Sequence, residues 1–160
     1  MFARACLGAA LTTVLGACAQ DRPTQRPDTP PPATVTAPDA SGLTAFQRRN
    51  GIGPITQEVT LAAPDHELAE KGQHLFEQKC SACHKMAERY VGPPLGGAVD
   101  RLGPTFVMNM ILNPEGMYTT HPDVKKLLGE YMTQMPNLQL SPDDARAVVE
   151  YLRTQPAAGT

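Results

Sequence analysis

Three residues near the middle of the chain could hold an iron cofactor: Cys80, Cys83 and His84, in the order Cys-x-x-Cys-His. Two thiols three positions apart can each add across a vinyl group of a porphyrin and form two thioethers. The histidine that follows is then carried under the porphyrin face, where its imidazole can ligate iron. The spacing therefore predicts covalent attachment of one haem c.

Two other kinds of site also use a Cys-x-x-Cys pair. It can be half of a zinc site, but the sequence has no second such pair and only scattered histidines. It can be a thioredoxin-like redox pair, but that needs a βαβ setting, which this proline-rich sequence does not indicate. Haem attachment is the better interpretation of the motif.

The composition indicates a small domain that follows a long, proline-rich segment. The chain has 160 residues, no Trp and 16 Pro, of which half precede Asp65. A domain this short would have difficulty filling a core with side chains alone, and a buried porphyrin would supply the missing apolar volume. The formal net charge of −2 argues against nucleic acid as a partner.

Residues 1–17 have the pattern of a secretory leader. Arg4 is followed by an apolar run that is too short to span a bilayer. The run closes with Leu-Gly-Ala-Cys, ending at Cys18, which resembles the lipobox of bacterial lipoproteins, in which the cysteine carries acyl chains. We therefore expect a lipid anchor at Cys18 on the periplasmic side of a bacterial membrane, inner or outer. The alternative is an ordinary leader cut after Ala17 or Ala19, which would leave a soluble periplasmic protein.

Two segments precede the domain. Residues 18–40 hold six prolines among Asp, Thr, Ala and Arg, a composition that cannot bury a core and is typical of an extended tether. Residues 41–64 regain apolar side chains. We expect them to form an irregular arm that packs on the domain, with a short extended segment near residues 55–61.

The two longest helices are predicted at the ends of residues 65–155. The first begins at Asp65, a suitable N-cap, and ends at about Lys79. The last begins at Ser141, which is followed by one Pro and two Asp, and ends near Arg153. Both boundaries follow from capping chemistry.

Gly72 indicates how these helices meet. Glycine costs stability inside a helix, so its presence suggests the close approach of another helix. We expect the last helix to cross the first at Gly72 and Phe76. The alternative is two amphipathic helices that cover the core without crossing.

Shorter helices are predicted between these two. One follows Pro104 and is stopped at Pro114, and another runs from near Pro122 to about Met132. No alternating apolar pattern indicates strands, so the domain is predicted to be all-α, with residues 156–160 as a tail.

A six-coordinate iron needs a second axial ligand, for which Met135 is the best candidate. It lies in a predicted loop before the last helix, where Pro136 stiffens the direction of its side chain. Met132 and His121 are the alternatives. The methionines on or just after the middle helix are more typical of gap-filling core residues: Met108, Met110 and Met117. A thioether ligand would raise the reduction potential relative to two histidines.

Residues after the motif could support the haem. A ligating histidine normally donates its other ring N–H to a fixed acceptor, and the Pro93 carbonyl, nine residues after His84, is the expected acceptor. The alternative is that Gly-Pro-Pro simply turns the chain. Leu95 should pack on the haem edge, and Tyr90 and Arg101 could reach a propionate or lie on plain surface.

Together these motifs resemble the monohaem class I cytochrome c family over residues 65–155. They fall in family order: Gly72 and Phe76, Cys80–His84, Gly92 and Pro93, Met135 and Pro136, Tyr151 and Leu152. The resemblance implies three to five helices wrapped around one haem c, and one-electron transfer between periplasmic redox proteins. Residues 106–117 also resemble lipoprotein cytochromes found with nitrous-oxide reductase systems, which suggests a terminal acceptor.

The leading hypothesis is a monomeric, membrane-anchored electron carrier rather than an enzyme. It would pass electrons from a respiratory donor to a terminal reductase, such as nitrous-oxide reductase, or to an oxidase. One alternative is a haem peroxidase or gas-binding sensor, which needs an open or labile iron site. Another is a cytochrome subunit fixed within a respiratory complex.

Overall fold

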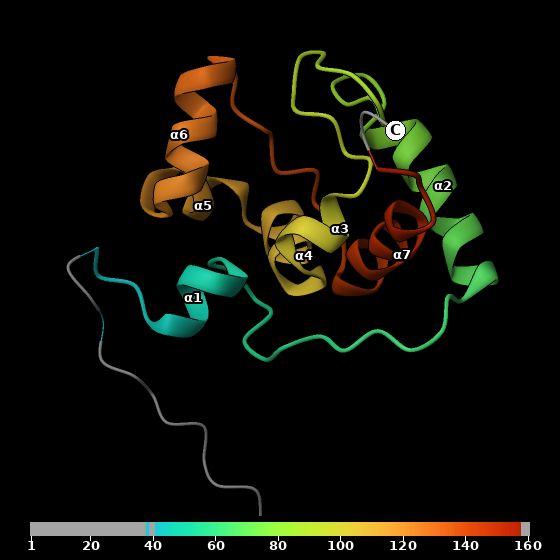
Figure 1. The fold of residues 1–160 in the computed structure, drawn as a ribbon, viewed down its shortest axis with the longest axis horizontal. Helices are drawn as coiled ribbons and strands as arrows, with labels where there is room; N and C mark the ends of the chain where they lie inside the picture. Colours follow the sequence, from blue (N-terminus) through green and yellow to red (C-terminus); the bar gives the residue numbers. More distant parts are fainter. Residues whose placement is uncertain (1–37, 39–40, 158–160) are drawn as a thin grey trace, which may run out of the picture. The chain divides into compact units, whose positions relative to one another are not determined.

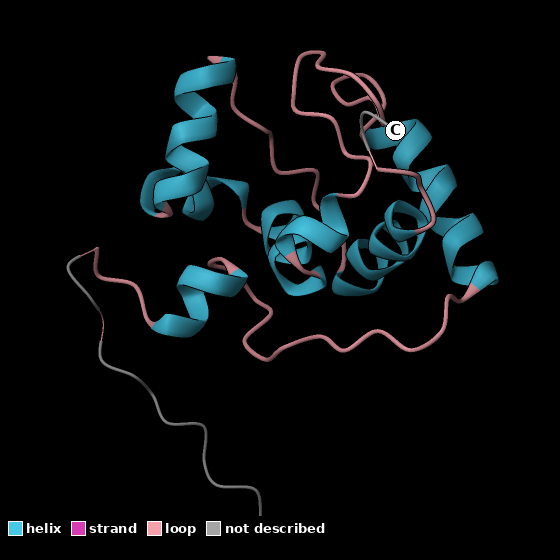
Figure 2. Cartoon of the chain, viewed as in Figure 1, coloured by secondary structure: helices cyan, strands magenta, loops and turns pink. Residues whose placement is uncertain are grey.

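The computed structural model describes residue 38 and residues 41–157, which contain helices and loops and no strand (Figures 1 and 2). The prediction of an all-α domain is confirmed. The predicted leader, the anchor at Cys18 and all but one residue of the tether lie outside the described residues. Within the described range, no helix has the length and apolar character needed to cross a membrane.

The two longest helices have the predicted boundaries. Helix α2 spans His66–Lys79, and the side chain of its N-cap, Asp65, accepts a hydrogen bond from the Leu68 amide at 3.0 Å. Helix α7 spans Pro142–Arg153 and begins with a reciprocal capping box between Ser141 and Asp144. The capping residues therefore position both helices, as the sequence predicted.

Helices α2 and α7 cross at the predicted residues (Figure 1). A Cβ atom at Gly72 would overlap the carbonyl oxygen of Ala147, so only glycine allows this approach. One turn further along, the rings of Phe76 and Tyr151 pack with their centroids 5.4 Å apart. The crossing is confirmed, and the alternative of two helices that do not cross is wrong.

Four shorter helices connect α2 to α7: α3 (Ala98–Leu102), α4 (Pro104–Leu112), α5 (Pro114–Thr120) and α6 (Pro122–Tyr131). Helices α4 and α6 were predicted, whereas α3 and α5 were not. Pro114 ends α4 as expected but also begins α5, because proline at the first helical position lacks only an amide that would have no partner there. The Asn113 side chain caps α5 by accepting from the Gly116 amide.

The arm of residues 41–64 contains a further helix, α1 (Ala45–Asn50), that was not predicted. A capping box between Thr44 and Gln47 starts this helix. The remainder of the arm has no regular secondary structure, so the expected extended segment forms no strand within the described chain. Its apolar side chains pack against the domain core: Ile52, Ile55, Val59 and Leu61.

Side chains of the domain hold the backbone of this arm. Asn109 on α4 is fully buried; its Nδ2 donates to the carbonyls of Asn50 at 2.9 Å and Ile55 at 3.0 Å, and its Oδ1 accepts from the Ile55 amide at 3.0 Å. The Thr105 hydroxyl accepts from the Val59 amide at 2.8 Å. Buried irregular backbone needs such partners because it has no ladder or helix of its own.

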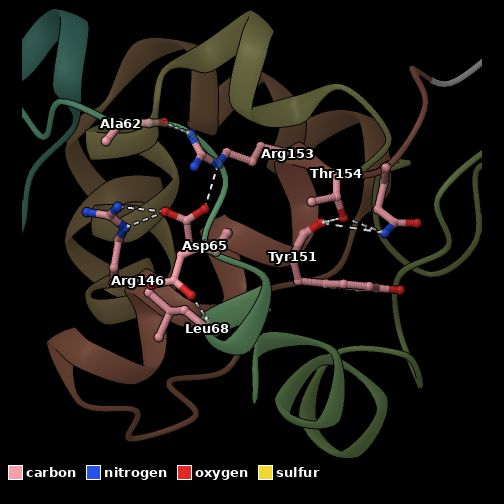
Figure 3. A network of polar contacts seen from close by, with 9 residues as sticks. Ala62, Asp65, Leu68, Arg146, Tyr151, Arg153 and Thr154 are labelled. Atoms are coloured by element: carbon pink, nitrogen blue, oxygen red, sulfur yellow. Dashed lines mark hydrogen bonds and ion pairs between the residues drawn. The ribbon is translucent and has the colours of Figure 1, made fainter. Parts of the chain in front are cut away.

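Two further contacts fasten the ends of the arm. His121, fully buried between α5 and α6, donates from Nε2 to the Arg48 carbonyl at 2.9 Å. At the other end, Arg153 on α7 donates to the Ala62 carbonyl at 2.9 Å (Figure 3). The carboxylate of Glu150, also fully buried, accepts from Arg153 and from Arg146, at 2.6 Å in each case. The arm is thus fixed along its length to α4, α6 and α7.

Candidate haem site

A large, mainly apolar cavity brings the predicted haem residues together. Its empty space is about 1260 Å³, including its opening to solvent. Its lining includes the three motif residues and the proposed sixth ligand: Cys80, Cys83, His84 and Met135. Other walls come from α3, α4, α6 and α7. A cavity with mainly apolar walls and a few polar groups is typical of a cofactor site.

The end of α2 positions the two thiols. Cys80 caps the helix, and the amides of Cys83 and His84 both donate to the Cys80 carbonyl, at 3.0 and 2.9 Å. This single turn places both thiols and the imidazole on the same cavity. Neither thiol forms a disulfide.

Two observations argue against the competing interpretations of the Cys-x-x-Cys-His motif. Burial, together with the nearby Cys83, raises the pKa of the Cys80 thiol to about 11. A thioredoxin-like pair instead needs a thiol with a lowered pKa. A zinc site also lacks support, because the described chain contains no group of three or more His, Cys, Asp or Glu side chains that could hold a metal ion. Two free thiols facing an apolar cavity fit thioether formation with haem.

His84 is held in the orientation that iron ligation requires. Its Nδ1 lies 2.9 Å from the Pro93 carbonyl, so the predicted hydrogen bond is confirmed. Since a carbonyl can only accept, Nδ1 carries the proton and Nε2 keeps a lone pair for a metal. Burial lowers the pKa of His84 and outweighs the opposing effect of the Pro93 bond. The neutral imidazole is the form that binds metals.

Gly92 is a site residue whose role was not recognised in the sequence. A Cβ atom there would lie 2.9 Å from Nδ1 and 3.1 Å from Nε2 of His84. Its own amide donates to the Cys83 carbonyl at 2.8 Å. The backbone of this loop therefore lies directly against the imidazole ring, and only glycine leaves room for it. The signal in the sequence was the glycine immediately before Pro93.

The cavity distinguishes among the candidates for the sixth ligand. Met135 lines it, whereas Met132 is 82% exposed and His121 is buried behind Phe106 and is not among the lining residues. Met110 on α4 also lines the cavity, although the sequence placed it among the core-filling methionines. Met135 comes from the loop between α6 and α7, as predicted, and its bond to iron stays a prediction.

The residues expected to surround the haem divide into two groups. Leu95 lines the cavity. Tyr90 and Arg101 do not: Tyr90 is 53% exposed beneath the Lys85 ammonium, and Arg101 donates to the Gly96 carbonyl at 2.7 Å. A propionate contact from either residue stays a prediction. In the structure, the bond from Arg101 supports the loop that contains Leu95.

Comparisons with known proteins find similarity to cytochromes c. Residues 69–156 match the family model described as cytochrome c. A cytochrome c from Rhodothermus marinus is 44% identical, with a TM-score of 0.64 over 68% of this chain and 93% of that one. An engineered cytochrome c from the same organism is 43% identical, with a TM-score of 0.64 over 68% of this chain and 94% of that one. The search of curated protein sequences found no match.

Proposed function

This chain belongs to the cytochrome c family, and we propose that it is a membrane-anchored electron carrier in which His84 and Met135 are the axial ligands of one haem c. Membership of the family implies covalent haem and electron transfer. The attached haem would supply an iron that alternates between the ferric and ferrous states. The ligands, the anchor and the redox partners are the parts that we propose.

The observation that carries the proposal is that one apolar cavity is lined by both thiols, the oriented imidazole and a thioether. Cys80 and Cys83 would hold the haem, and His84, whose imidazole is fixed by Pro93, would supply a nitrogen ligand to the iron. Met135 would occupy the remaining axial position. A thioether there raises the reduction potential relative to a second histidine, and a filled position favours electron transfer over peroxide chemistry.

The ligand set can be tested on the purified haem-loaded protein. Ferric iron bound by a thioether has a weak far-red absorption band, which we expect in the wild type and expect Met135→Ala to abolish. Met110→Leu is the matched control, because Met110 lines the same cavity and its substitution should leave the band in place. A wild type without the band, or Met135→Ala with the band intact, would show that the ligand assignment is wrong.

Carbon monoxide binding to the same protein distinguishes an electron carrier from a peroxidase or gas sensor. A closed six-coordinate site should bind carbon monoxide slowly in the wild type and rapidly in Met135→Ala. Rapid binding by the wild type would favour the enzyme or sensor instead. A cytochrome fixed in a respiratory complex would co-purify stably with its partner. A carrier should exchange electrons with a separate donor and with a terminal reductase or oxidase.

The proposed anchor rests on the sequence that ends at Cys18, which resembles a lipobox. Because α1 and the arm pack on the domain, the connecting segment extends only from Cys18 to Thr44, roughly 26 residues. A flexible chain of this length would span roughly 25–30 Å r.m.s., and a proline-rich chain would be more extended than that. Such a tether would keep the haem domain near the membrane and raise its effective concentration around membrane-bound partners.

Growth with radiolabelled palmitate tests the anchor. The label should appear in the wild type and be lost in Cys18→Ser. A label that persists in Cys18→Ser would show that another residue is acylated, and an unlabelled wild type would favour a soluble periplasmic protein.

A further inference from the structure

We propose that Arg89 is a positioning residue that holds together the two segments carrying the axial ligands, residues 80–95 and residues 132–141. This inference rests on the proposed ligation by His84 and Met135. Arg89 lies in the segment that follows the haem motif, five residues after His84.

Arg89 makes three contacts with the end of α6, which is 41 residues further along the chain. Its Nη1 lies 3.1 Å from the Glu130 carboxylate, and its Nη2 donates to the Glu130 backbone carbonyl at 2.8 Å. Its guanidinium carbon also lies 4.1 Å from the centre of the Tyr131 ring. An ion pair, a backbone hydrogen bond and a cation–π contact therefore meet on one side chain.

Helix α6 needs a positive charge from outside at this end. The last carbonyls of a helix lack intrahelical partners and carry partial negative charge. The last turn of α6 contains no basic residue, and Glu130 adds a further negative charge there. Arg89 satisfies one of these carbonyls and neutralises the carboxylate. This is a more favourable arrangement than an isolated surface ion pair, which contributes little.

The loop that carries Arg89 is itself bonded to the turn that carries Cys80, Cys83 and His84. Arg89 lies between His84 and Gly92, and the segment around it is bonded back to the turn. The amide of Gly92 donates to the Cys83 carbonyl at 2.8 Å, and that of Leu95 donates to the Lys85 carbonyl at 2.9 Å. These bonds limit how far the loop that carries Arg89 can shift relative to His84.

The link also limits the loop that carries Met135. Tyr131 is the last residue of α6 and lines the cavity four residues before Met135. Beyond it, residues 132–141 have no regular structure, so the direction in which the loop leaves α6 influences where the Met135 thioether lies. In Figure 1 the segment after α2 and the carboxyl end of α6 lie at the same edge of the domain. By joining them, Arg89 would disfavour the motion that withdraws Met135 from iron.

Binding of imidazole to the ferric, haem-loaded protein measures this effect, because imidazole must displace Met135. We expect Arg89→Ala to bind imidazole roughly tenfold more tightly than the wild type, from the combined loss of the three contacts. Arg89→Lys keeps the charge but loses the fork and the stacking, so its affinity should lie between the two. The far-red band of Arg89→Ala should remain but disappear at lower imidazole concentration.

Lys71→Ala is the matched control. Lys71 is 51% exposed against 54% for Arg89, and it pairs with Asp144 at 2.7 Å, joining α2 to α7 rather than the two ligand segments. Its removal should leave imidazole affinity unchanged. If Arg89→Ala and Lys71→Ala bound imidazole equally, the positioning role would be overturned although Met135 remained the ligand. A wild type without the far-red band would instead overturn the ligation, and this role of Arg89 with it.

Discussion

The Nδ1 atom of His84 donates to the carbonyl oxygen of Pro93 across 2.9 Å, and this bond sets which ring nitrogen faces the cavity. Pro93 has no amide of its own to compete, and its ring restricts the backbone from which the carbonyl projects. The preceding residue, Gly92, lies flat against the imidazole. The orientation of His84 thus depends on two adjacent residues: Gly92, whose backbone is the less restricted, and Pro93, whose ring restricts its backbone.

Gly92→Ala should displace the His84 ring, because the added Cβ would lie about 3 Å from both ring nitrogens. We expect a loss of ~1–3 kcal/mol in the free energy of unfolding, as for other overpacked sites. Chemical denaturation of the haem-loaded protein measures it, and a changed visible spectrum should accompany it. Gly129→Ala is the control: Gly129 lies within α6 with open space around it, so alanine should stabilise by ~0.5–1 kcal/mol. Equal effects of the two substitutions would contradict the packing role of Gly92.

The features that the sequence predicted are those whose signals are local. The haem motif spans five residues, and the caps at Asp65 and Ser141 act within three residues of themselves. The crossing at Gly72 was also predictable, because a glycine inside a helix usually has a packing reason for being there. Helix α1 was missed although Thr44 and Gln47 form a readable capping box, because the surrounding arm shows no helical apolar pattern.

The features that were not predicted depend on residues distant in the chain. Asn109 bonds to backbone groups 54 and 59 residues away, and His121 to a carbonyl 73 residues away. A polar side chain in a sequence does not reveal which distant carbonyl it will meet. Arg89 is a similar case, because only the fold shows that it pairs with Glu130. The sequence predicted the cavity only indirectly, because a domain this short has too few side chains to fill a core without a cofactor.

Asn109→Leu should release the middle of the arm. The substitution keeps a side chain of similar size but leaves the carbonyls of Asn50 and Ile55 and the amide of Ile55 without their partner. Each unsatisfied buried group costs ~1–3 kcal/mol, so the arm should open locally before the domain unfolds. Hydrogen exchange of the Ile55 amide should accelerate strongly.

The control for the arm is Asn137→Leu. The Asn137 side chain accepts an exposed hydrogen bond from the Gln139 amide. Both residues lie in the loop that follows α6, away from the arm in the chain. This change should leave exchange at Ile55 unaltered. Protection of the Ile55 amide that survived Asn109→Leu would show that apolar packing alone holds the arm.

Glu150→Gln should destabilise the protein far more than most single charge removals. Glu150 is fully buried, and it accepts from Arg146 and Arg153 at 2.6 Å each. Removing its charge leaves the positive charges of Arg146 and Arg153 without a negative partner, which should lower the free energy of unfolding by ~3–5 kcal/mol. Glu70→Gln on the exposed face of α2 should change stability by less than ~0.5 kcal/mol. A small effect at Glu150 would mean that solvent reaches the arginines when the charge is lost.

The ion pair between α2 and α7 should give the protein a specific loss of stability in acid. The Lys71 ammonium, followed by Ser141, lowers the pKa of Asp144 below its ordinary value. A carboxyl whose pKa is lower in the folded state stabilises that state above its unfolded pKa, near ~4, and loses this contribution as the pH falls through the folded value. The difference in unfolding free energy between wild type and Asp144→Asn should therefore be constant from about pH 5 to pH 8 and shrink below about pH 4. Urea denaturation across that range measures it.

The control repeats the comparison in a Lys71→Ala background. The difference in unfolding free energy caused by Asp144→Asn should be smaller there, because the Lys71 ammonium, the main cause of the lowered Asp144 pKa, is absent. A difference that stayed constant down to pH 2 would contradict the linkage between Lys71 and Asp144.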